Sequence, residues 1–121
     1  MRFDADPRVD ALVDDTIARV ADKWTMLLIE ALEDAGARRF SQLSRAVPGI
    51  SQKMLTQTLR AMEREGLVTR TVYPQVPPRV EYRLTALGDE LAAALCGVWL
   101  WAERNLTRIE AARAAYDARA G

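Results

Sequence analysis

The sequence predicts an α+β fold that is mainly α-helical, with one β-hairpin in the second half of the chain. Two observations carry this prediction. Apolar residues recur at helical spacing in five segments, which are residues 8–20, 23–33, 42–47, 51–65 and 85–110. Between the last two segments the spacing changes to alternation, which predicts strands at residues 67–73 and 79–84.

The composition is that of one domain, residues 1–121, with a substantial core. Half of the 121 residues are hydrophobic, and no apolar run approaches the about 18 residues that a membrane span requires. The first seven residues are acidic and lack an apolar segment, so we expect no signal peptide. The single cysteine cannot form a disulfide within the chain. Together these features predict a cytoplasmic protein.

The sequence contains no histidine, and this argues against an enzyme. Histidine is the commonest general base and the commonest metal ligand, so a Ser–His or Cys–His catalytic pair is excluded. The sequence also lacks a Gly-rich phosphate loop and the paired cysteines of a metal site. We therefore expect no catalytic residues, no metal and no cofactor.

The net charge of zero hides an uneven distribution. Residues 1–34 carry four cations and nine anions, and residues 85–121 carry four cations and five anions. The middle of the chain, residues 35–84, carries nine cations and three anions, a net charge of +6. A basic middle between acidic ends is the asymmetry expected of a surface that binds nucleic acid.

The first two helices have recognisable starts. Asp6 and Pro7 provide a capping carboxylate and a first-turn proline for the helix 8–20. Asp22 is the expected cap of the helix 23–33, and Gly36 follows its end. The residues of this second helix that we expect to face inward are Trp24, Leu27, Leu28, Ala31 and Leu32.

A helix-turn-helix is predicted next. Residues 38–40 form a short extended piece, and Ser41 is the expected cap of the helix 42–47, whose Leu43 and Ala46 would face inward. Pro48-Gly49 predicts a tight turn. The following helix starts at the N-cap Ser51 and ends before Gly66, with an inward stripe of Leu55, Leu59 and Met62.

The outer face of this helix carries long polar and cationic side chains, namely Gln52, Lys53, Thr56, Gln57, Arg60 and Arg64, and no acid precedes Glu63. Gln suits adenine, Lys and Arg suit guanine or phosphate, and Thr can contact the thymine methyl. We expect Gln52, Lys53, Thr56 and Gln57 to read bases. Ser51 is a helix cap first and a phosphate contact second, and Arg60 either binds phosphate or is simply solvated.

The two strands form a hairpin around the stiff loop 74–78, which contains three prolines. A helix-turn-helix followed at once by a hairpin is a winged helix-turn-helix. We expect Arg79 to project outward at the tip of this wing, and Arg70 and Arg83 to be offered by its strands, to phosphates or a minor groove.

The last helix begins after its N-cap Thr85 and is more apolar than one small domain can cover. We therefore predict that it packs, with the helix 8–20, against a second copy of the chain, so that both are dimerisation helices and residues 23–84 form the DNA-binding part. The residues predicted at that dimer interface are Leu12, Leu91, Leu95, Val98, Trp99, Ala102 and Leu106. The sequence leaves open whether residues beyond 111 are helical or frayed.

Several stretches resemble one family in order and spacing. They are Lys23-Trp24, Arg39 to Leu43, Pro48 to Thr56, Glu65 to Val68, Val72 to Tyr82 and Leu84 to Gly88. Over about residues 15–105 the chain is similar to the HxlR-type transcriptional regulators, relatives of the MarR winged helices. The resemblance implies a homodimeric bacterial regulator that binds operator DNA, with repression the more usual mode.

Other interpretations stay open. Several members of that family sense oxidants through a cysteine that precedes the Lys-Trp motif, and this chain has none there. Its Cys96 lies among apolar residues of the last helix and is predicted to be buried, inert packing. A sensing role for Cys96 would be ruled out by unchanged DNA affinity in a Cys96→Ser protein, measured with and without oxidant.

The alternatives are a ligand- or redox-responsive activator on the same fold, or a winged-helix protein-interaction module without DNA binding. A small-molecule effector between the wing domain and the dimer helices is compatible with the sequence, which does not identify it. Trp24, Trp99 and Trp101 are assigned to the core and the dimer interface rather than to a ligand cage.

Overall fold

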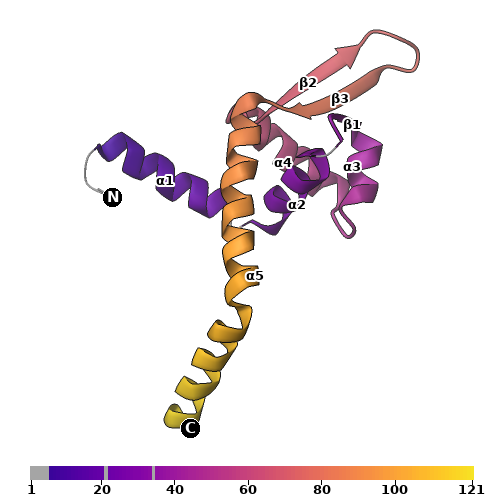
Figure 1. Cartoon of the computed structure of the whole chain (residues 1–121). Coiled ribbons are helices and arrows are strands. Elements are labelled where there is room, and N and C mark those ends of the chain that lie inside the picture. The colour runs from indigo at the N-terminus through magenta and orange to yellow at the C-terminus, as the bar shows by residue number, and fades with distance from the viewer. Residues whose placement is uncertain (1–5, 21, 34) are drawn as a thin grey trace. The chain divides into compact units, whose positions relative to one another are not determined.

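The computed structural model describes residues 6–20, 22–33 and 35–121 and confirms the mainly helical α+β fold (Figure 1). The chain divides into two compact units, Met1–Asp89 and Glu90–Gly121. The elements are α1 (Pro7–Val20), α2 (Lys23–Glu33), β1 (Ala37–Arg39), α3 (Phe40–Ala46), α4 (Gln52–Arg64), β2 (Val68–Tyr73), β3 (Arg79–Leu84) and α5 (Ala86–Ala120). The prediction about a signal peptide falls largely on residues 1–5, which lie outside the described residues.

Both predicted aspartate caps are present. The Asp6 carboxylate accepts a hydrogen bond from the Arg8 backbone N–H at 2.9 Å, and Asp22 accepts one from Trp24 at 3.0 Å. Each bond satisfies a first-turn donor that the helix itself leaves free. The side-chain hydrogen bond from Arg8 also holds the pKa of Asp6 below its usual value, so this cap stays charged until the pH falls further than for a free aspartate.

The core of the first unit lies between α2, α3, α4 and the sheet. Leu28, Leu43, Leu55 and Met62 are fully buried there, and the predicted stripe on α4 faces inward as expected. The start of α4 is fixed by Ser51, whose hydroxyl accepts from the Met54 N–H at 3.0 Å. Its end is fixed by Gly66, which has a φ of +78° that favours glycine.

Helix α3 begins earlier than predicted. Ser41 is not its cap, because the helix already starts at Phe40 and its first turn is closed by Gln42, whose Oε1 accepts from the Arg39 N–H at 2.8 Å. The shift follows from pairing of β1 with β3, which fixes the backbone up to Arg39. Ala46, which we expected to face inward, is exposed.

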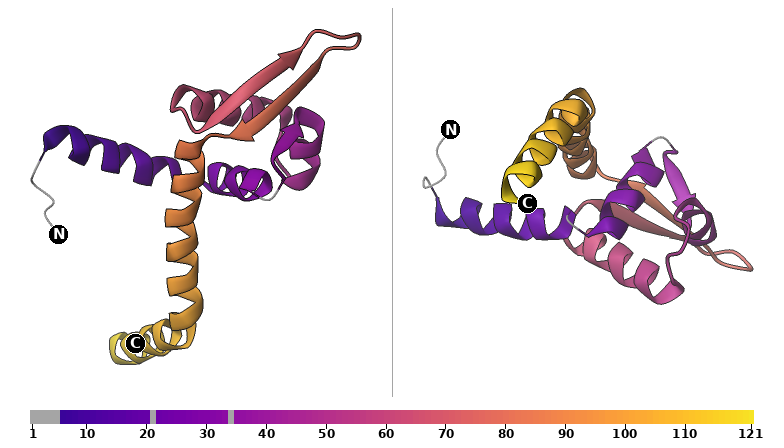
Figure 2. Two further views of the ribbon diagram at one scale, coloured as in Figure 1. Left: turned by 45° about the horizontal axis from the view of Figure 1, so that its top comes forward. Right: turned by 90° about the horizontal axis from the view of Figure 1, so that it is seen from below.

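The sheet has three antiparallel strands in the order β1-β3-β2. Residues Val68–Tyr73 pair with Leu84–Arg79 in unbroken register, and the resulting hairpin extends beyond α3 and α4 as the wing (Figure 2). Because side chains alternate between the faces of a strand, Arg70 and its partner Tyr82 share one face. Arg83 lies on the other face.

Helix α5 includes the residues beyond 111, whose conformation the sequence left open. It extends to Ala120, about ten residues beyond the expected end. Alanine and arginine have high helix propensity, so residues 111–120 need no apolar stripe to continue the helix. Its start is as predicted, since the Thr85 hydroxyl accepts from the Gly88 N–H at 3.0 Å.

Helix α4 provides a direct stability test. Ser51→Ala is expected to lower the free energy of unfolding by about 1 kcal/mol, because it removes the acceptor for the Met54 N–H. Ser41→Ala is the matched control, since Ser41 caps nothing, and should change stability by less than about 0.5 kcal/mol. Urea unfolding midpoints at one protein concentration measure both, and equal losses would contradict the assignment of the cap.

Candidate nucleic-acid interface

The outer face of α4 is open to solvent. Gln52, Lys53, Gln57, Arg60 and Arg64 are exposed, whereas Thr56 is half-buried. The Ser51 cap and the buried stripe fix the rotation of the helix, so these side chains are presented along one side of it. This face can offer amide and cationic groups to base edges and phosphates.

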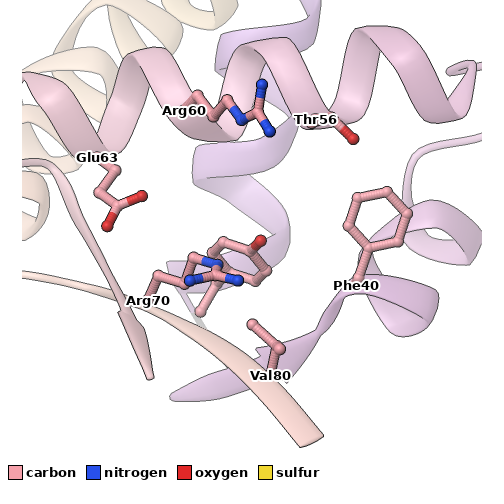
Figure 3. Close-up of a pocket in the computed structure, with 7 residues that line it drawn as sticks. Phe40, Thr56, Arg60, Glu63, Arg70 and Val80 are labelled. Atoms are coloured by element: carbon pink, nitrogen blue, oxygen red, sulfur yellow. The ribbon is translucent and has the colours of Figure 1, made fainter. Parts of the chain in front are cut away.

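A cavity of about 480 Å³ lies between α4 and the wing. It brings together three of the predicted site residues, Thr56 and Arg60 from α4 and Arg70 from β2 (Figure 3). The remaining lining residues are Phe40, Glu63, Val80 and Tyr82. Arg60 and Arg70 extend into this space from opposite sides, while the Phe40 ring lies at one side of it.

Arg60 and Arg70 have no ionic partner among the residues that the structure describes. This holds although Glu63 lines the same cavity. Arg64 differs, because it pairs with Glu65 at 3.1 Å, and Glu65 also pairs with Arg19 of α1 at 3.5 Å. The Arg60/Arg70 pair is therefore suited to an oxyanion from outside, such as a DNA phosphate.

A second cavity of about 400 Å³ continues toward the tip of the wing and shares Phe40 and Val80 with the first. Its other lining residues are Arg39, Ser41, Gln75, Pro77, Pro78 and Arg79. The two cavities adjoin along β3 and together carry four arginines.

The expected orientation of Arg79 is wrong. Instead of projecting outward, its guanidinium lies over the Tyr73 ring at 4.2 Å from the centroid, and Tyr73 is its partner across the hairpin. The Arg79 Nε is buried and has no hydrogen-bond partner among the described residues. This cation–π contact holds the charge against the strands.

The structure does not bring Arg83 to either cavity. Arg83 is exposed, but it lies on the face of the sheet opposite to Arg70 and Tyr82. Sequence reasoning also missed Phe40, Val80 and Tyr82 as the apolar wall of the cavity. The alternation of β3 placed Val80 and Tyr82 on one face, but the position of Phe40 depends on β1 pairing with β3.

The residues predicted to form a dimer interface are free to make contacts. Leu12 of α1 and Val98, Trp99 and Leu106 of α5 are each more than half exposed, Ala102 is exposed, and Leu91 and Leu95 are half-buried. Cys96 is also exposed in the single chain, so its predicted burial as inert packing depends on the second subunit that α5 is expected to contact. Its neighbours Val98 and Trp99 on α5 are exposed as well.

The part of the chain that the structure describes contains no helix that is long and apolar enough to cross a membrane.

Comparisons with known proteins agree with this geometry. The family described as HxlR-like helix-turn-helix matches residues 19–110. A relative from Escherichia coli, named as the uncharacterized HTH-type transcriptional regulator YtfH, is 40% identical over 99 residues, covering 82% of this chain and 78% of the relative. YdeP of Bacillus subtilis, named in the same way, is 40% identical over 108 residues, covering 87% and 84%.

Solved structures show the same likeness. A putative transcriptional regulator, ytfH from Salmonella typhimurium, matches with a TM-score of 0.70 at 40% identity, covering 84% of this chain and 89% of that one. The redox regulator HypR in its reduced form matches with a TM-score of 0.72 at 39% identity, covering 82% and 97%. The match extends well beyond the helix-turn-helix in both cases.

Proposed function

Because the chain belongs to the HxlR-like helix-turn-helix family, we propose that this transcriptional regulator is a homodimeric repressor of the genes next to its operator. Helix α4 of each subunit enters a major groove, and the wing contacts the adjacent backbone or minor groove. The observation that carries this proposal is the pair Arg60 and Arg70, which have no ionic partner among the described residues and lie between the exposed polar face of α4 and the wing.

The contacts divide by chemistry. Gln52, Lys53 and Gln57 are exposed near the start of α4, where recognition helices reach base edges. Arg60 and Arg70 hold a phosphate in the cavity, with Thr56 as an additional hydroxyl contact. Ser51 and Arg79 are proposed as backbone contacts at the two ends of this surface. Arg83 lies on the other face of the sheet, away from the cavity. Its contact with DNA stays a prediction, and this arrangement gives it no phosphate to bind.

The base-reading role has a specific test. Gln57→Ala is expected to reduce discrimination between the operator and a scrambled duplex by roughly tenfold, since losing a good side-chain contact to a base costs about 1–3 kcal/mol of discrimination. Lys53→Ala separates the two modes of contact. If Lys53 contacts a base, its loss should lower the discrimination between the duplexes. If it contacts a phosphate, its loss should lower the affinity for both duplexes alike. Fluorescence anisotropy titrations measure these affinities, and unchanged discrimination in both variants would contradict α4 as the reading helix.

The proposed dimer is inferred from the exposed apolar faces of α1 and α5. Val9, Leu12, Val13 and Ile17 recur at helical spacing on α1 and are all exposed. On α5, Trp99 and Leu106 are also exposed and lie seven residues apart, which is helical spacing. Apolar surface of this extent is typical of protein interfaces, and a second subunit is the partner that also supplies a second recognition helix.

Sedimentation equilibrium tests the dimer. The wild-type protein is expected at about twice the 13.5 kDa mass of one chain. Leu12→Glu combined with Trp99→Glu should shift it toward monomer and weaken operator binding, because charges would be buried without partners. Val72→Glu, an equivalent change at an exposed position of β2, is the control and should leave the mass unchanged. A monomeric wild-type protein would contradict this part of the proposal.

A further inference from the structure

The tip of the wing ends in an apolar side chain. Val76 is completely exposed, with a relative exposure of 101%, and lies in the middle of the loop 74–78 between β2 and β3. This loop, Pro74-Gln75-Val76-Pro77-Pro78, contains no charged residue. The most protruding part of the wing is therefore uncharged.

The tip is also poor in groups that bind phosphate. Its three prolines have no backbone N–H, and the Gln75 N–H already donates to the Tyr73 carbonyl at 2.9 Å. The nearest cation, Arg79, is held over the Tyr73 ring behind the tip. A phosphate contact made by this loop would have no cation and would depend on the Val76 N–H and the Gln75 side-chain amide alone.

We propose that Val76 enters the minor groove of the operator and selects A·T pairs there, an inference that rests on the proposed DNA binding. The floor of the groove presents only acceptors at an A·T pair, whereas a G·C pair adds the guanine N2 amino group. When Val76 packs against a G·C pair, the guanine N2 amino group loses its hydrogen bond to water. The isopropyl group offers no acceptor to replace that bond, so the contact is unfavourable. The side chain therefore tolerates A·T pairs and rejects G·C pairs.

DNA is a better occupant than a protein partner because the tip is small. A stable protein interface buries on the order of 1,000 Å² or more in total, which one valine between prolines does not supply. A hairpin tip instead matches the minor groove, which is about 6 Å wide, and apolar wedges are a known means of contacting it.

The test uses base analogues. An operator is first selected from random duplexes with the full-length wild-type protein, and the pair under the wing is then varied as A·T, G·C or inosine·C. Inosine lacks the N2 amino group, so inosine·C resembles A·T in the minor groove and G·C in the major groove. The wild-type protein is expected to bind A·T and inosine·C with equal affinity and G·C roughly fivefold more weakly.

A variant assigns the effect to the residue. Val76→Ser replaces the isopropyl group by a hydroxymethyl group, whose oxygen can accept from the N2 amino group, and it should reduce the discrimination to within about twofold. Val72→Ser, on the same hairpin and also exposed, should retain the full discrimination. Because Val76 is fully exposed in the chain, the Val76→Ser variant is expected to fold normally.

The outcomes separate the inference from the function on which it rests. If no duplex is bound above a scrambled control, the proposed DNA-binding function fails. If the operator is bound but inosine·C behaves as G·C, the position is read from the major groove and the inference is overturned. Unchanged discrimination between A·T and G·C in the Val76→Ser variant would also overturn the inference. The alternative would then be that the tip of the wing contacts a protein.

Discussion

Replacing both Arg60 and Arg70 by alanine is expected to lower the affinity for operator DNA by about a hundredfold. Both guanidiniums line the cavity between α4 and the wing, and neither is paired within the described residues. Hydrogen bonds to charged groups contribute about 1.5–3 kcal/mol each, so two such contacts account for an effect of this size. Titrations of labelled duplex DNA at fixed salt concentration measure it.

The salt dependence shows how many phosphates are involved. Each phosphate that a cation no longer neutralises should reduce the slope of log K against log salt by about 0.9 in magnitude. Arg64→Ala is the matched control on the same helix, because Arg64 pairs with Glu65 and does not line the cavity. An Arg64 variant as weak as the Arg60/Arg70 double variant would show that the cavity has no special role.

Gly88→Ala is expected to lower the free energy of unfolding by about 3 kcal/mol, a cost in the upper range for overpacking. A Cβ at position 88 would collide with the Leu67 carbonyl oxygen and lie 2.9 Å from Leu84 Cδ2. The backbone cannot easily retreat, since Thr85 donates from its N–H to Leu67 at 2.9 Å and from its hydroxyl to Gly66 at 2.6 Å. These bonds attach the first turn of α5 to the junction of α4 and β2.

The control for this change lies on the same helix. Apart from its chain neighbours and the nearby backbone of its own helix, no atom of the described residues lies within 4 Å of where a Cβ at Gly97 would stand, so Gly97→Ala should stabilise the protein by about 0.5–1 kcal/mol through helix propensity alone. Chemical unfolding at one protein concentration compares the two. A stabilised Gly88→Ala protein would contradict the close approach of α5 to Leu67.

Features that depend on neighbouring residues could be predicted from the sequence. The start and end of α4 follow from Ser51 and Gly66, and its buried stripe follows from the spacing of Leu55, Leu59 and Met62. The hairpin follows from the alternation in its strands and the prolines between them. Aspartate caps on α1 and α2 were predictable for the same reason, since the capping group is two residues from its donor.

Features that depend on distant residues could not be predicted. The stacking of Arg79 on Tyr73 requires the register of β2 with β3, and the start of α3 requires β1 to pair with β3. The cavity needs α4 and both wing strands in place before Arg60 and Arg70 face each other. Cys96 was predicted to be inert packing because its neighbours are apolar, but it is exposed in the single chain, and a helix sequence alone does not say what covers such a face.

The most direct measurement is a titration of the purified protein into its own upstream DNA and into a scrambled duplex at several salt concentrations. A sequence-specific regulator should bind the upstream DNA more tightly than the scrambled duplex. Its affinity should fall steeply with salt, with a slope of about 0.9 for each phosphate neutralised. Absence of binding to either duplex at low salt would contradict the proposal that α4 and the wing form a DNA-binding surface.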